Sequence, residues 1–215
     1  ANSIVGFKKN IRILLNLIEE IDLDKVSSLI YFSSVKVYGN QPKLPISEKT
    51  VTNPIDWYSF AKVNCEWMLN YCLGGKLPVT ILRIPGIYGE APRERSIIGN
   101  FIKDIHQNGK VTVFGSGKVK RDYVYIGDLA RIVEQLIVRY SNGGVGILNI
   151  ATGQAHSILK ILDKIRGALG MDFVIGDSMK GKNNFDLRFN TRKLIKLLPS
   201  FNFTKLEDGI CSYKK

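Results

Sequence analysis

The sequence has few cysteines and few histidines, which limits the sites that it can build. Cys65, Cys72 and Cys211 form an odd set without a Cys-x-x-Cys pair. Such a set favours a reducing compartment and argues against a disulfide framework or a structural zinc site. The two histidines, His106 and His156, lie far apart in the sequence. We therefore expect no metal site, and a histidine-based hydrolase triad is disfavoured.

Long apolar runs and secretion signals are also missing. No apolar stretch approaches the roughly 20 residues that span a membrane, and the first residues form no signal-peptide pattern. Hydrophobic residues make up 45% and charged residues 23% of the 215 positions, which is typical of an ordinary globular protein. The sequence predicts a cytoplasmic protein with no membrane partner.

Acidic residues are scarce beside basic ones, with 19 Asp and Glu against 31 Lys and Arg and a net charge of +12. Such a balance can indicate nucleic-acid binding. The basic residues are scattered, however, and their densest run (Lys118, Lys120 and Arg121) falls in one loop. Nucleic-acid binding is therefore disfavoured. It would be recognised by binding that weakens with salt. A basic surface also suits an anionic small substrate such as a nucleotide diphosphate.

Helical and strand-like segments alternate along the chain. Helices are expected over residues 4–21, 57–73, 96–106, 129–139, 157–169 and 191–198. Strands are expected over residues 26–33, 78–84, 111–114, 146–151 and 172–175. Residues 39–54 and 176–184 are expected to be loops, and residues 115–117 a hairpin turn. The alternation predicts an α/β fold with a doubly wound parallel sheet.

Residues 33–62 carry the pattern with the clearest chemistry. A Ser-Ser-Val-Lys-Val-Tyr-Gly run begins at Ser33, and Tyr58 and Lys62 follow as Tyr-x-x-x-Lys. Residues four apart on a helix share one face. An ammonium there lowers the pKa of the phenol, so the tyrosinate becomes reachable near neutral pH. Ser34 ends an apolar strand and can hold the oxygen of an alcohol or ketone beside the phenol.

This pattern resembles the extended short-chain dehydrogenase/reductases, in the branch of NAD-dependent nucleotide-sugar epimerases and dehydratases. The resemblance runs from about Asn10 to Leu206. It implies a Rossmann-type sheet that binds NAD and a smaller C-terminal α/β region that binds a nucleotide-diphosphate sugar. By position, the implied catalytic residues are Ser34, Tyr58 and Lys62. The implied cofactor-binding residues are Ser33, Tyr58, Lys62 and Pro85, and the implied substrate-binding residues are Ser34, Gly86, Arg121 and Arg188.

A segment that begins at Arg83 is similar to a second family motif, with two departures. Gly86 stands where many epimerases have an Asn that touches the substrate diphosphate, and Glu90 stands where Pro is usual. A glycine has no side chain to make that substrate contact. Trp57 and Trp67 are expected to be packing residues.

A third family motif begins at Arg121, and the resemblance implies that its guanidinium grips the substrate phosphates. The forked donors of Arg suit phosphate oxygens. Asp122 and Asp128 are expected to be structural, as a turn partner and a helix cap. In the following loop Asn183 stands where many members have an Arg, so Arg188 or Lys182 is expected to take over its role.

No segment carries the Gly-x-x-Gly-x-x-Gly pattern that binds a dinucleotide at the first strand and helix of such a fold. The Gly-Ser-Gly at 115–117 has no third glycine after it. We therefore expect this sequence to be the C-terminal two-thirds of an enzyme, without the N-terminal strands. Residues 1–90 would belong to the NAD-binding domain. Residues 91–215 would mainly bind substrate, with segments around 111–150 returning to the main sheet.

The residues after Ser34 bear on the type of reaction. Dehydratases of the family have an Asp-Glu pair there, which eliminates water, whereas this chain has Val35 and Lys36. A valine transfers no proton, so 4,6-dehydration and sugar-acid decarboxylation are disfavoured. An NAD-dependent epimerase is favoured, and a keto-sugar-nucleotide reductase using NADPH is the alternative. A non-catalytic nucleotide-binding relative is less expected, because Ser34, Tyr58 and Lys62 are all present.

Family resemblance also implies a homodimer and a role in polysaccharide biosynthesis. Family members pair through the helices that correspond to residues 4–21 and 57–73. The apolar residues expected at that seam are Ile13, Leu17, Trp67 and Leu69.

Overall fold

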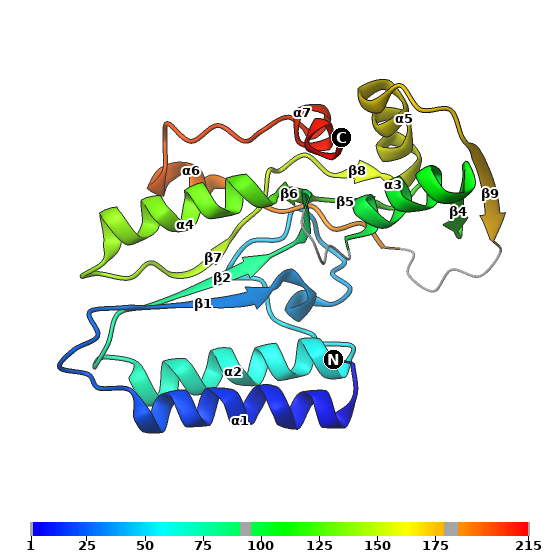
Figure 1. Cartoon of the computed structure of the whole chain (residues 1–215). Coiled ribbons are helices and arrows are strands. Elements are labelled where there is room, and N and C mark those ends of the chain that lie inside the picture. Colours follow the sequence, from blue (N-terminus) through cyan, green and yellow to red (C-terminus); the bar gives the residue numbers. More distant parts are fainter. Residues whose placement is uncertain (1, 91–95, 179–184, 215) are drawn as a thin grey trace.

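A computed structural model describes residues 2–90, 96–178 and 185–214 of the chain. Its main sheet has three parallel strands in the order β1-β2-β7, formed by β1 (Leu29–Ser34), β2 (Val79–Ile84) and β7 (Gly146–Asn149). Leu29 lies opposite Val79, and Thr80 lies opposite Gly146. Among the described residues β1 pairs with β2 alone, so it forms one edge of this sheet (Figure 1).

Two parallel helices, α1 (Ile4–Glu20) and α2 (Trp57–Leu73), cover one face of the main sheet (Figure 1). The apolar stripe of α1 presents Leu14 to the face of α2 that carries Cys65, Leu69 and Leu73. This cluster contacts Leu29, Tyr31 and Val79 of the sheet. The bounds of α2 agree with the predicted helix, because Asp56 and Ser59 form a reciprocal capping box at its start.

The opposite face of the sheet is covered by α4 (Ile126–Tyr140) and α6 (Arg192–Leu197). Leu129, Ile132 and Leu136 of α4 pack with Leu82 of β2 and Leu148 of β7. Helices on both faces of a parallel sheet make three layers. The structure therefore confirms the predicted doubly wound α/β fold.

A second, smaller core lies beyond the carboxyl ends of the main strands. It contains α3 (Ile97–Asn108), β4 (Lys110–Phe114), α5 (Ile158–Leu169), β9 (Val174–Ser178), α7 (Leu206–Ile210) and the 3-10 turn η2 (Cys211–Tyr213). β4 and β9 pair in parallel. Two short strand pairs connect the two cores: β3 (Gly86–Tyr88) with β6 (Tyr123–Tyr125), and β5 (Lys120–Arg121) with β8 (His156–Ser157). β7 and α4 thus lie with the main sheet, whereas β4 does not.

Three local predictions need correction. Residues 115–117 do not form a hairpin turn, because β4 pairs with β9 and β5 pairs with β8. The strand expected at 172–175 spans Val174–Ser178, because it follows β4 along its whole length. Asp128 does not cap α4, which begins at Ile126; its carboxylate instead accepts hydrogen bonds from the backbone N–H and the hydroxyl of Thr204.

The structural role expected for Asp122 is confirmed. Its carboxylate accepts hydrogen bonds from the N–H and hydroxyl of Thr152 and from the N–H of Gly153, which fixes the turn after β7. Lys182 and Asn183 lie outside the described residues.

Within the described residues no helix is long and apolar enough to cross a membrane. The same part of the chain contains no group of three or more His, Cys, Asp or Glu side chains placed to hold a metal ion.

Candidate active site

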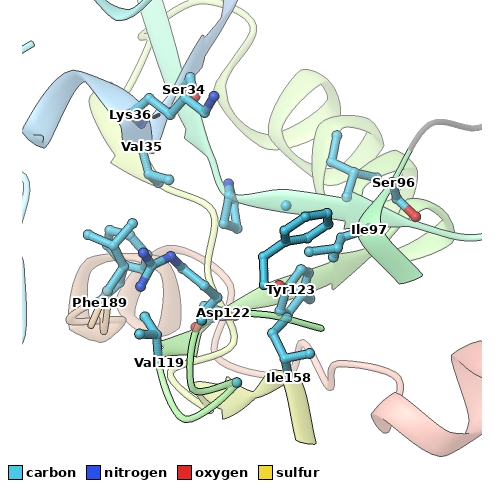
Figure 2. A pocket seen from close by; sticks show the side chains of 18 of the residues that line it. Ser34, Val35, Lys36, Ser96, Ile97, Val119, Asp122, Tyr123, Ile158 and Phe189 are labelled. Carbon is cyan, nitrogen blue, oxygen red and sulfur yellow. Dashed lines mark hydrogen bonds between the residues drawn. The ribbon is translucent and has the colours of Figure 1, made fainter. Parts of the chain in front are cut away.

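A cavity of about 840 Å³ opens where the carboxyl ends of β1 and β2 meet the smaller core. Residues far apart in the sequence line it, as Figure 2 shows for Ser34, Ile97, Tyr123 and Phe189. In open α/β sheets the carboxyl ends of the strands are where ligands bind. The position of the cavity therefore follows from the topology of the sheet.

Ser34 and Tyr58, which the sequence predicts to be catalytic, both line this cavity. Ser34 ends β1, where the chain turns into the 3-10 turn η1 (Val35–Tyr38), and its hydroxyl accepts a hydrogen bond from the Lys36 N–H at 3.2 Å. Tyr58 lies in the first turn of α2. Burial raises the pKa of Tyr58, the hydrogen-bonding Ser34 hydroxyl lowers it, and Asp56 raises it. The serine hydroxyl and the phenol therefore belong to one cavity.

Lys62 lies one turn after Tyr58 on α2, as predicted, but its ammonium contacts the sheet. Its Nζ donates to the Phe32 carbonyl oxygen at 2.6 Å and lies 6.0 Å from the centre of the Tyr58 ring. Burial lowers the pKa of Lys62. The lowering of the Tyr58 pKa by this ammonium stays a prediction, and burial raises the pKa of the phenol in this structure.

A buried ion pair fixes α2 to the sheet behind these residues. Glu66 lies one turn after Lys62 and accepts from Arg83 of β2, with Nε 3.0 Å from Oε1 and Nη2 2.5 Å from Oε2. Ser33 also donates to Glu66, at 2.5 Å. The Ser33 hydroxyl thus donates to a buried protein carboxylate, and the expectation that Ser33 binds the cofactor stays a prediction. The sequence analysis missed Glu66, although it lies at i+4 from Lys62 on the same helix face.

The Arg83 side chain of this ion pair also contacts a buried aromatic ring. The Arg83 guanidinium lies 4.7 Å from the centre of the Tyr38 ring, and the Tyr38 hydroxyl donates to Asn149 Oδ1 at 2.7 Å. The Asn149 N–H in turn donates to Glu48 at 3.0 Å. Strands β2 and β7, η1 and the loop after η1 are thus joined by polar contacts within the main core.

Pro85 and Gly86 line the cavity as expected, and the structure explains the departure at Gly86. A Cβ atom at Gly86 would lie 2.8 and 2.9 Å from two ring atoms of Tyr123. Real Cβ atoms do not approach other atoms so closely. The Tyr123 ring therefore occupies the space that a side chain at position 86 would need.

Arg121 also lines the cavity. Its Nη1 donates to the Lys120 carbonyl at 3.0 Å and to the Phe185 carbonyl, and the guanidinium lies 5.2 Å from the centre of the Phe185 ring. Burial lowers the pKa of Arg121, whereas Tyr123 and Asp186 raise it. The structure thus brings Arg121 to the site that Ser34 and Tyr58 define.

Arg188 is not brought to the cavity, which corrects its prediction as a substrate-binding residue. Leu187 and Phe189 line the cavity, whereas Arg188 is exposed and its carbonyl oxygen accepts from the Ile46 N–H. Neighbouring side chains of an extended segment point to opposite faces. The side chain of Arg188 therefore lies on the face away from the cavity.

Comparisons with known sequences identify the family of the chain. Residues 2–151 match the model of the NAD dependent epimerase/dehydratase family. A putative UDP-glucose 4-epimerase of Methanocaldococcus jannaschii is 31% identical over 161 residues, which cover 73% of this chain and 51% of the relative. A dTDP-D-glucose 4,6-dehydratase of Dictyostelium discoideum is 32% identical over 179 residues, covering 74% and 41%. The chain thus spans about half the length of the curated relatives that it matches.

Solved structures show the same fold. An ADP-L-glycero-D-manno-heptose-6-epimerase of Helicobacter pylori superimposes with a TM-score of 0.83 at 26% identity, over 96% of this chain and 65% of that one. A UDP-glucuronic acid 4-epimerase of Bacillus cereus gives a TM-score of 0.82 at 24% identity, over 94% and 64%. NAD is the cofactor of the matching family. The chain belongs to the NAD-dependent epimerase/dehydratase family.

Proposed function

We propose that this protein is an NAD-dependent epimerase that acts on a nucleotide-diphosphate sugar. The observation that carries the proposal is the meeting of Ser34 and Tyr58 in a cavity that also holds Arg121. A phenol and a hydroxyl at one point can move a proton to and from a ring hydroxyl. A guanidinium in the same cavity suits a diphosphate.

Tyr58 would take the proton from the reacting sugar hydroxyl and later return it, while Ser34 holds the same oxygen by a hydrogen bond. NAD, when bound, supplies the acceptor and donor of a hydride. The Lys62 ammonium suits the ribose of NAD, because it uses one proton on the Phe32 carbonyl and has two more to donate. Pro85 would line the cofactor side of the cavity.

The residues after Ser34 support epimerisation over dehydration. Val35 is buried and has no proton to give, and Lys36 carries a cation where elimination of water would need a carboxylate base. An epimerase of this kind needs only reversible removal of hydride and proton at one carbon. The two elimination groups that a dehydratase adds are therefore unnecessary.

The curated relatives support a nucleotide sugar as substrate. Their names include UDP-glucose, UDP-arabinose and UDP-glucuronate 4-epimerases. Arg121 would contact the diphosphate of such a substrate, with the sugar at Ser34 and Tyr58.

We also propose a homodimer that pairs through α1 and α2. Ile13 and Leu17 of α1 are exposed by 60% and 43%, and Trp67 of α2 by 74%. Trp67 is therefore not the packing residue that the sequence suggested. Leu69, expected at the seam, is buried between the two helices and is removed from it. Three large apolar side chains on the outer face of a helix pair suit contact with a second copy.

The test is to incubate the purified protein with NAD and UDP-glucose, UDP-arabinose or UDP-glucuronic acid, and to follow the sugar by proton NMR. We expect inversion at one ring carbon without net change in NAD. Tyr58→Phe should slow this reaction about 10²- to 10⁴-fold. Tyr71→Phe is the matched control, because Tyr71 lies on the same helix and is 90% exposed.

Two other results would replace the proposal. Consumption of NADPH with a keto-sugar nucleotide, without epimer formation, would identify a reductase. Binding of nucleotide sugars without any turnover would identify a non-catalytic relative.

A further inference from the structure

The charged side chains that line the cavity differ in sign, and they differ in whether other residues already bind them. The charged described side chains that line it are Lys36, Arg121 and Asp122. Asp122 is 2% exposed and accepts three hydrogen bonds from Thr152 and Gly153, so the turn after β7 occupies it. The two charges left for a ligand are both positive.

Lys36 lies at the reacting end of the cavity. Its backbone N–H donates to the Ser34 hydroxyl, and its Nζ lies 5.6 Å from the centre of the Tyr58 ring. Figure 2 shows the Lys36 side chain extending beside Ser34 along one edge of the cavity. A group bound by this ammonium would therefore be attached close to the carbon that reacts.

The Lys36 ammonium forms no ion pair with another residue in the described parts of the chain. The charge of Lys36 acts on Asp56, because it contributes to lowering the pKa of that carboxyl. The Asp56 carboxylate, however, accepts from the N–H and hydroxyl of Ser59 and caps α2. Lys36 thus has charge and donors available for a ligand, without a competing protein carboxylate in contact.

Arg121 lies at a different place. Val119 and Asp122, which flank it in the sequence, lie across the cavity from Lys36 in Figure 2. Its guanidinium is held by the Lys120 and Phe185 carbonyl groups and by the Phe185 ring. Two separated cations match a ligand with two separated anionic groups.

We propose that Lys36 binds a carboxylate on the sugar ring, so that the preferred substrate is a nucleotide-diphosphate sugar acid rather than a neutral sugar. This inference rests on the proposed function, because it assumes that the sugar lies at Ser34 and Tyr58. A charge-assisted hydrogen bond between ammonium and carboxylate is stronger than one to a neutral hydroxyl. A sugar acid gives the ammonium this partner, and its diphosphate remains with Arg121.

The test measures binding of two probes, UDP-glucuronic acid and UDP-glucose, by calorimetry with NAD present. The probes differ only in a carboxylate against a hydroxymethyl group. The unchanged protein should bind UDP-glucuronic acid about tenfold more tightly, the ratio expected for one charge-assisted contact. Lys36→Met should bring the two dissociation constants together and leave that of UDP-glucose nearly unchanged.

Two control variants accompany this test. Lys49→Met removes an exposed lysine of the loop after η1 that does not line the cavity, and it should retain the tenfold ratio. Lys36→Arg keeps the charge and should retain most of the ratio. Thermal melting of each variant shows whether it is folded before its binding is compared.

Equal affinity of the unchanged protein for the two probes would overturn the inference and leave the proposed function standing. A ratio that Lys36→Met does not reduce would also overturn it. Failure of both probes to bind would instead refute the nucleotide-sugar site, and the inference with it.

Discussion

Removing the charge of Glu66 should strongly destabilise the fold, although the substitution Glu66→Gln changes the shape of the side chain very little. The side chains of Glu66 and Arg83 are exposed by only 3% and 4%. The carboxylate accepts from Arg83 Nε and Nη2 and from the Ser33 hydroxyl. A glutamine offers one acceptor oxygen, and its NH₂ group would face the Arg83 donors.

Breaking a buried ion pair from one side costs about 3–5 kcal/mol, because it leaves a charge in the interior without its partner. For a chain of this size, roughly 2–4 °C of melting temperature is lost per kcal/mol. Glu66→Gln should therefore lower the melting temperature by about 10 °C. Urea unfolding gives the matching change in free energy.

The double variant Glu66→Met with Arg83→Met tests whether such a loss comes from the charge of Arg83 left without its partner or from the loss of the ion pair itself. It removes both charges and keeps similar volumes, so it should be less destabilised than Glu66→Gln. A loss below about 1 kcal/mol for Glu66→Gln, as found for exposed pairs, would refute the reasoning. A double variant as unstable as the sum of its single variants would refute it too.

Three further perturbations follow. Burial raises the pKa of Asp122 from its ordinary 3.8 to about 6, so its contribution to stability is full below pH 4 and is lost as pH rises through 6. Asp122→Asn should remove about 3 kcal/mol of this fall in unfolding free energy, measured in urea from pH 3.5 to 7. An unchanged pH profile of the variant would contradict the raised pKa. Gly86→Ala should cost about 1–3 kcal/mol by displacing the Tyr123 ring, and little of that cost should remain in a Tyr123→Ala background, as thermal melting would show. Trp67→Lys should shift the protein from dimer to monomer in sedimentation, whereas Ile195→Lys, on the opposite face of the sheet and 57% exposed, should leave it a dimer; equal behaviour of the two variants would argue against the α1–α2 seam.

The catalytic helix and its strand could be predicted because local signals determine them. The capping residue Asp56 and the glycine at position 74 mark the ends of α2, and the spacing of Tyr58 and Lys62 places both on one face. The end of an apolar strand likewise locates Ser34. Each of these signals lies within a few residues of the feature that it predicts.

What the sequence could not indicate depends on contacts between distant segments. Whether the Lys62 ammonium faces Tyr58 or the Phe32 carbonyl is decided by the packing of α2 on β1. The exclusion of Arg188 from the cavity depends on the pairing of its segment with Ile46. The partnership of Ser33 with Glu66 joins residues 33 positions apart. Residue type alone could not choose between these alternatives.

The edge position of β1 has a practical consequence for handling the chain. Along one side of β1 the described residues provide no strand partner for its backbone N–H and C=O groups. Beside this edge, Phe32 and the outer side of α4 form an apolar groove of about 490 Å³. An open strand edge with apolar neighbours is a template on which further strands can add. In concentrated solution residues 1–215 taken alone should therefore self-associate through β1, and light scattering should increase with concentration unless a further strand covers that edge.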